Sequence, residues 1–158
     1  MKRSENKMEH RNMKKRIPLL FLAGLLAGGT AIAQAKIIHL HATLHPVKGV
    51  LTKGSGKMTG NYNTKTDTVR WRVLYHNLTS KVIMAHFHGP ITKPGQNAGI
   101  QVWLTKPPAH PMPVAPIVGS AKVSPTQAKE LLSGEWYVLI HTKKHPAGEI
   151  RGRVLTGT

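Results

Sequence analysis

The stretch Val69-Arg70-Trp71-Arg72-Val73-Leu74-Tyr75-His76 places Val69, Trp71, Val73 and Tyr75 at alternate positions, with Arg70, Arg72 and His76 between or beside them. Successive side chains of a β-strand point to opposite faces of its sheet, so this period of two predicts a strand with one buried and one solvent-facing side. The neighbouring residues 81–88 are nearly all apolar, which is typical of a central strand. These two stretches predict a protein built on a β-sheet.

Six further ranges have a strand-like composition and are separated by glycine, proline and asparagine, the residues of turns. They are residues 37–44, 56–62, 99–104, 117–123, 135–141 and 149–155. An antiparallel sheet with one apolar face must bury that face against a second layer, which favours a sandwich or a barrel. We therefore predict an all-β fold, an antiparallel β-sandwich.

One short helix is predicted to interrupt the strands. Ser124 is suited to cap it, Pro125 suits the first helical position, and Gln127 completes the spacing of a capping box. Gly134 is expected to end the helix.

Residues 105–116 contain five prolines, and this composition predicts a stiff extended loop.

The first 33 residues have the pattern of a secretory signal peptide. The basic run Lys14-Lys15-Arg16 precedes an apolar stretch, and Ala31-Ile32-Ala33 fits the small-x-small cleavage pattern, with Ala33-Gln34-Ala35 as a second register. An uncleaved anchor is the alternative, although an apolar run of about 17 residues is at the short limit for spanning a bilayer. The long basic region also makes Met13 an alternative start. We predict a signal peptide at 1–33, membrane contact only before its cleavage, and a single secreted or periplasmic domain at 34–158.

The chain is strongly basic, with 23 Lys and Arg residues against six Asp and Glu. Seven of the basic and two of the acidic residues precede residue 34, so the predicted domain keeps a formal charge of +12. This charge predicts attraction to an anionic envelope component or an unidentified protein partner, and for an exported protein we expect no nucleic acid. A charge that serves only solubility is the alternative. The chain has no cysteine, so its core must hold the domain together without disulfides.

Histidine is the abundant candidate for site chemistry. His86 and His88 have strand spacing, so both imidazoles are expected on one face of a sheet. His141 and His145 follow the start of a later predicted strand, and the fold can bring them alongside that pair. The leading interpretation is that these rings are structural, hydrogen-bond to the backbone and hold no cofactor. The alternative is a copper or zinc site formed by His86, His88, His141 and His145, because a cluster of imidazoles binds these metals without cysteine.

Another histidine group, His39, His41 and His45, is expected on an exposed strand, with a copper-capturing patch as the alternative. Catalysis has little support, because the predicted domain has no cysteine and no Gly-x-Ser-x-Gly elbow. It also contains only four acidic residues. One of these acids, Glu149, is two residues from Arg151, and this spacing predicts that both lie on a salt-bridged or solvated face of a strand. The alternative is a buried network formed by Glu149 and Arg151. Each tryptophan lies in a predicted strand, so core packing is expected of all three. They are Trp71, Trp103 and Trp136.

Four motifs, in this order, resemble the CHRD domain. They are Ala85-His86-Phe87-His88-Gly89-Pro90, Gly99-Ile100-Gln101-Val102-Trp103-Leu104, Tyr137-Val138-Leu139-Ile140-His141-Thr142 and Gly148-Glu149-Ile150-Arg151-Gly152. The resemblance spans residues 39–155 and implies a sandwich similar to the immunoglobulin or copper/zinc superoxide dismutase folds. One departure is at residues 44–47, where family members often have a glutamate and two prolines.

Many bacterial members of this family stand alone behind a signal peptide and have no assigned activity. The resemblance therefore implies a non-catalytic binding or structural module of the cell envelope, with histidine-based metal binding as the alternative. A dismutase-like enzyme is the least favoured interpretation, because a shared sandwich does not confer a shared site.

Overall fold

The alternating stretch around Trp71 forms strand β3, in which Val69, Trp71 and Val73 are buried while Arg70 and Arg72 are exposed. The computed structural model describes residues 34–105 and 114–157. Its strands are β1 (Ile37–Pro46), β2 (Ser55–Asn63), β3 (Thr68–His76), β4 (Val82–His88), β5 (Ile100–Trp103), β6 (Ile117–Lys122), β7 (Tyr137–Thr142), β8 (Ile150–Arg153) and β9 (Leu155–Thr156). All their pairings are antiparallel, and the one helix of the described residues is α1 (Pro125–Leu132). The predicted all-β antiparallel fold with one short helix is confirmed.

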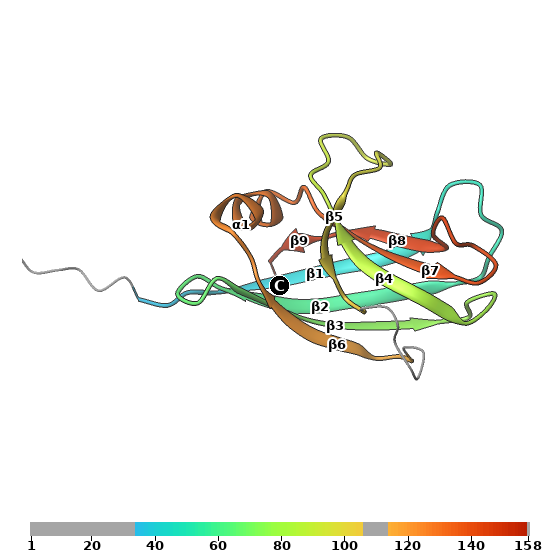
Figure 1. The fold of residues 1–158 in the computed structure, drawn as a ribbon, viewed down its shortest axis with the longest axis horizontal. Coiled ribbons are helices and arrows are strands. Elements are labelled where there is room, and N and C mark those ends of the chain that lie inside the picture. The colour runs from blue at the N-terminus through green and yellow to red at the C-terminus, as the bar shows by residue number, and fades with distance from the viewer. Residues whose placement is uncertain (1–33, 106–113, 158) are drawn as a thin grey trace, which may run out of the picture. The chain divides into compact units, whose positions relative to one another are not determined.

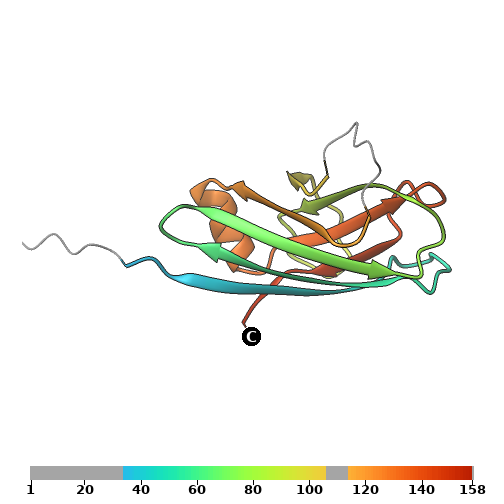
Figure 2. The same cartoon turned by 90° about the horizontal axis from the view of Figure 1, so that it is seen from below.

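The strands form two layers that are joined through β1 (Figures 1 and 2). The order is β5-β4-β7-β8-β1-β2-β3-β6, so β1 lies at the boundary between the layers. Most of β1 pairs with β2, whereas His45 and Pro46 at its end pair with β8, and Leu40 and His41 pair with β9. The sandwich is therefore one continuous sheet that folds over and nearly closes into a barrel.

The apolar faces of the two layers meet in one core. Trp71 from one layer packs edge-on against Phe87 from the other, with ring centroids 5.6 Å apart. Trp136 is fully buried beside Phe87. Full burial of a large apolar side chain contributes about 1.5–3 kcal/mol, so these rings are major contributors to stability. The core positions predicted for Trp71 and Trp136 are confirmed.

Helix α1 has the predicted ends. The Ser124 side chain accepts a hydrogen bond from the Gln127 amide at 3.2 Å, and the Gln127 side chain accepts one from the Ser124 amide at 3.0 Å. Gly134 follows the helix with φ +70°, a conformation that glycine adopts without strain. Leu131 on the inner side of the helix is fully buried, so α1 covers one end of the core.

The described residues, 34–105 and 114–157, belong to one compact unit. The predicted signal peptide at 1–33 and positions 106–113 of the predicted proline-rich loop lie outside the described residues. Within the described part of the chain, none of the helical structure has the length and apolar character needed to span a membrane.

Candidate metal centre

Three histidines meet on the outer face of the layer that contains β4 and β7. His86 and His88 alternate along β4, and in the antiparallel register His86 lies opposite Leu139 of β7. His141, two residues beyond Leu139, is therefore the diagonal neighbour of His86 on the same face. The side chains of all three histidines are buried, although their face points away from the main core.

The three imidazoles are close enough to share one ion. One ring nitrogen can be taken from each histidine so that all three nitrogens lie within 4.8 Å of one another. The ring centroids are 5.0 Å apart for His86 and His141, and 5.3 Å apart for His86 and His88. No aspartate or glutamate belongs to this cluster in the described part of the chain. The cluster is thus an all-nitrogen ligand set.

Backbone carbonyls fix the orientation of two of these rings. His88 Nδ1 lies 2.9 Å from the oxygen of Ala98, and His141 Nδ1 lies 2.9 Å from the oxygen of Pro146. A carbonyl oxygen only accepts, so in both rings Nδ1 carries the proton and Nε2 has a free lone pair. This arrangement is typical of histidine ligands, whose second nitrogen donates to a backbone carbonyl or a carboxylate.

Four nitrogens of the cluster have no hydrogen-bond partner among the described residues. They are Nε2 of His88, Nε2 of His141 and both ring nitrogens of His86. A buried polar atom without a partner costs about 1–3 kcal/mol, so buried polar atoms are nearly always satisfied. The expectation that these histidines are hydrogen-bonded structural residues accounts for the Nδ1 atoms of His88 and His141 and for no other nitrogen of the cluster. The donor set fits a metal ion.

The environment keeps the three rings neutral at pH 7. Burial, with the neighbouring rings of His141 and His88, lowers the pKa of His86 to about 4. Burial also lowers the pKa values of His88 and His141, against the opposing effect of their hydrogen bonds to backbone carbonyls. Neutral imidazole is the form that coordinates metals, so protons compete weakly for these nitrogens.

Aromatic and cationic side chains surround the cluster. Trp103 of β5 pairs with His86 across the sheet and meets its ring edge-on, with centroids 4.2 Å apart. The predicted core position of Trp103 is wrong: β5 is an edge strand, and 37% of this side chain is exposed. Tyr137 stacks on His88 at 5.1 Å, and the Arg151 guanidinium lies 3.8 Å from the Tyr137 ring centroid. The pattern of histidines indicated neither Tyr137 nor Arg151.

His145 is not part of the cluster. Its side chain is half-buried, and its backbone forms the turn after β7 by bonding in both directions with the backbone of Thr142. That turn carries the Pro146 carbonyl that orients His141.

In the other histidine group, His39 and His45 are exposed and His41 is half-buried, so the expected exposed strand describes them well. These three do not form a cluster of metal-ligand geometry in the described structure.

Glu149 is not on a salt-bridged or solvated face, and both interpretations that linked it to Arg151 are wrong. The Glu149 side chain is fully buried just before β8, whereas Arg151 donates to the backbone oxygen of Gln96. Three threonine hydroxyls and one backbone amide, at 2.6–2.8 Å, donate to the carboxylate. They are the hydroxyls of Thr52, Thr79 and Thr142 and the amide of Thr79.

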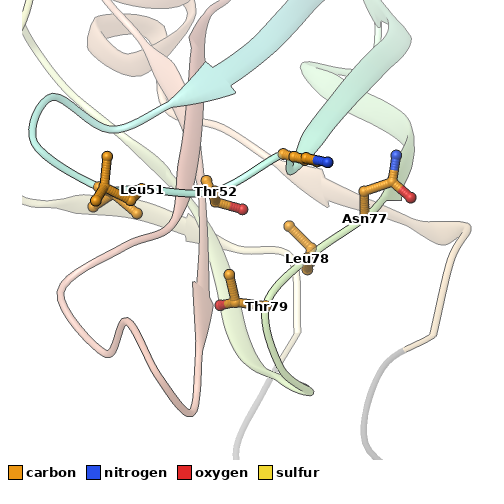
Figure 3. Close-up of a pocket in the computed structure, with 7 residues that line it drawn as sticks. Leu51, Thr52, Asn77, Leu78 and Thr79 are labelled. Carbon is orange, nitrogen blue, oxygen red and sulfur yellow. The ribbon is translucent and has the colours of Figure 1, made fainter.

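The threonines around Glu149 come from separate parts of the chain. Thr52 lies in the β1–β2 loop and Thr79 in the β3–β4 loop, and both line an open pocket (Figure 3). Burial alone raises the pKa of this carboxyl, but the hydrogen bonds from Thr142, Thr52 and Thr79 outweigh that effect and hold the pKa below its ordinary value. Glu149 therefore ties two loops to β7 as a charged hydrogen-bond acceptor and belongs to the framework rather than to the histidine cluster.

Comparison with known protein families matches residues 26–154 to the CHRD domain. No curated protein matches the chain, and no solved structure matches it. The matched range covers most of the sequence and includes the three clustered histidines and Glu149. The chain therefore belongs to the CHRD domain family.

Proposed function

We propose that this protein binds one copper or zinc ion through His86, His88 and His141. The observation that supports the proposal is the convergence of four buried ring nitrogens that have no hydrogen-bond partner in the described structure. In this proposal Nε2 of His88, Nε2 of His141 and one nitrogen of His86 are the ligands.

The chemistry of the donors favours copper or zinc over other common ions. Three neutral imidazoles supply nitrogen and no negative charge, whereas magnesium and calcium prefer carboxylate and carbonyl oxygens. Zinc is bound by three histidines in known proteins, and imidazole suits copper equally well. A bound ion supplies positive charge and Lewis acidity at this face. The protein supplies the fixed Nε2 atoms of His88 and His141, which Ala98 and Pro146 orient.

The convergence of the histidines favours metal binding over an envelope module without a bound ion. The sequence alone favours the module, because that convergence is not visible in a sequence. Export to the periplasm or the exterior remains part of the proposal and is supported by the signal-peptide pattern of residues 1–33. A binding role without catalysis also remains part of the proposal, and its support is the sequence, because the predicted domain has no cysteine and no Gly-x-Ser-x-Gly elbow.

Calorimetric titration of the tag-free exported protein with Zn²⁺ and Cu²⁺ tests the proposal. The wild type is expected to bind one ion per chain, and the double variant His86→Ala/His88→Ala is expected to lose this binding. The matched control is His39→Ala/His41→Ala, which removes two histidines with the same spacing from β1 and is expected to bind as the wild type does.

His145→Ala is a second control and is also expected to retain binding, because His145 lies outside the cluster. Circular dichroism of each variant separates loss of ligands from loss of fold. Unchanged binding in His86→Ala/His88→Ala, or equal loss in the His39→Ala/His41→Ala control, would contradict the proposal.

A further inference from the structure

The layer that contains β1, β2 and β3 has a second, polar face that points away from the core. The strand register puts His39, Asn61 and Arg70 side by side in one row across the three strands. The adjacent row contains His41, Thr59 and Arg72. Neighbouring strands are about 4.8 Å apart, so the rows form a flat grid of polar side chains.

Positive charge on this face is not neutralised by the described residues. Lys57 lies one row beyond Thr59 on β2, and Lys57, Arg70 and Arg72 are all exposed. None of the three makes an ion pair or a side-chain hydrogen bond within the part of the chain that the structure describes. The four acidic residues of that part, Asp67, Glu130, Glu135 and Glu149, occupy none of these rows.

Two shallow hollows cross this face and share Thr59. One is lined by Thr59, Gly60, Asn61, Arg70, Trp71 and Arg72. The other runs over β1 and is lined by His39, Leu40, His41, Thr43, Lys57 and Thr59, with Gly157. Because Thr59 lines both, the two hollows adjoin over β1, β2 and β3. We call the pair the basic groove.

We propose that the basic groove binds an acidic polysaccharide. The positive charges of Lys57, Arg70 and Arg72 complement carboxylate or sulfate groups, and Arg in particular donates paired hydrogen bonds to such anions. Thr59 and Asn61 lie between these cations and offer hydrogen bonds to sugar hydroxyl groups. The groove is thus suited to a chain that carries both anionic and hydroxyl groups along its length.

The composition of this face favours a polysaccharide over a membrane surface. Proteins that bind in the membrane interface bury Trp, Phe or Leu side chains among the lipids. On this face the exposed large apolar side chains are Ile37, Leu74, Val118 and Leu155; each lies on a different strand, none is aromatic, and none lines the groove. Apolar side chains that stand singly beside cations fit a hydrated polymer better than a lipid surface.

The test uses polygalacturonic acid as the probe and neutral dextran as its control, with binding to the exported protein measured by calorimetry at several salt concentrations. The triple variant Lys57→Gln/Arg70→Gln/Arg72→Gln is expected to bind the polyacid about tenfold or more weakly, because it loses three exposed ionic contacts. Its binding is also expected to depend less on salt.

A matched variant, Lys93→Gln/Lys143→Gln/Lys144→Gln, removes the same charge from exposed loop positions elsewhere and is expected to bind as the wild type does. His86→Ala/His88→Ala is also expected to retain polysaccharide binding, so failure here and failure of the metal proposal are distinguishable. Equal weakening in both triple variants would show an effect of net charge alone and overturn the proposal. Binding to vesicles that contain phosphatidylglycerol, without binding to the polyacid, would overturn it in favour of a membrane surface.

Discussion

Replacing Glu149 by glutamine tests whether this buried carboxylate stabilises the fold through its charge. Glutamine has the same shape, but its amide nitrogen donates where the carboxylate Oε2 accepts hydrogen bonds from Thr79 and Thr142 at 2.8 and 2.6 Å. The other oxygen keeps its two donors and loses its charge. Hydrogen bonds to charged groups contribute about 1.5–3 kcal/mol each and neutral ones about 0.5–1.5 kcal/mol, so the loss across the site is about 3 kcal/mol.

Equilibrium unfolding in urea, followed by tryptophan fluorescence, measures this loss. A loss of about 3 kcal/mol is a large part of the 5–15 kcal/mol that stabilises a typical domain. The control is Glu135→Gln, which removes the charge of a half-buried glutamate and is expected to change the free energy of unfolding by about 0.5 kcal/mol or less. A loss below about 1 kcal/mol in Glu149→Gln would refute the reasoning.

The same variant is also expected to change how the free energy of unfolding depends on pH. The folded protein lowers the pKa of Glu149, so the unfolded chain binds this proton more readily. The resulting stability is fully present above the ordinary pKa of about 4.5 and is lost as the pH falls through the lower folded value. Wild-type protein is therefore expected to lose stability on acidification, and Glu149→Gln to lose correspondingly less. Identical acid dependence in the two proteins would contradict this account.

Three further predictions concern the cap, the core and the metal site. Ser124→Ala is expected to lower the free energy of unfolding by about 1 kcal/mol in urea denaturation, because the capping hydrogen bond is lost, and no change would contradict the capping role. Leu131→Ala is expected to cost about 2–5 kcal/mol, whereas Leu51→Ala, at a side chain 94% exposed, is expected to have almost no effect in the same assay. Trp103→Phe is expected to remove most of the fluorescence quenching caused by Cu²⁺, because its indole contacts His86; undiminished quenching would place the ion elsewhere.

Local sequence patterns predicted the parts of this fold that depend on neighbouring residues. The alternation around Trp71 and the Ser124–Gln127 spacing are local, and both have the predicted structure. The predicted strand at 149–155 is instead divided at Val154 into β8, which pairs with β7 and β1, and β9, which pairs with β1. That division depends on strands distant in the sequence, which periodicity does not describe.

The sequence predicted only part of the candidate site, because local spacing describes neighbours along one strand and not the pairing between strands. The spacing of His86 and His88 determines that they share a face, and His141 joins them through the pairing of β4 with β7. His145 lies in the tight turn after β7, so its proximity to His141 in the sequence does not place it in the cluster. The role of Glu149 was missed because its threonine partners Thr52 and Thr79 are 97 and 70 residues away in the sequence.

The position of β1 between β2, β8 and β9 links the assembly of the fold to the completion of the chain. The first strand of the domain obtains part of its pairing only from the last two, so the nascent polypeptide must close a loop of more than 100 residues before β1 is fully paired. Such distant pairing makes folding slow compared with that of proteins rich in local contacts. The fold therefore cannot be completed until the residues of β8 and β9 have left the ribosome.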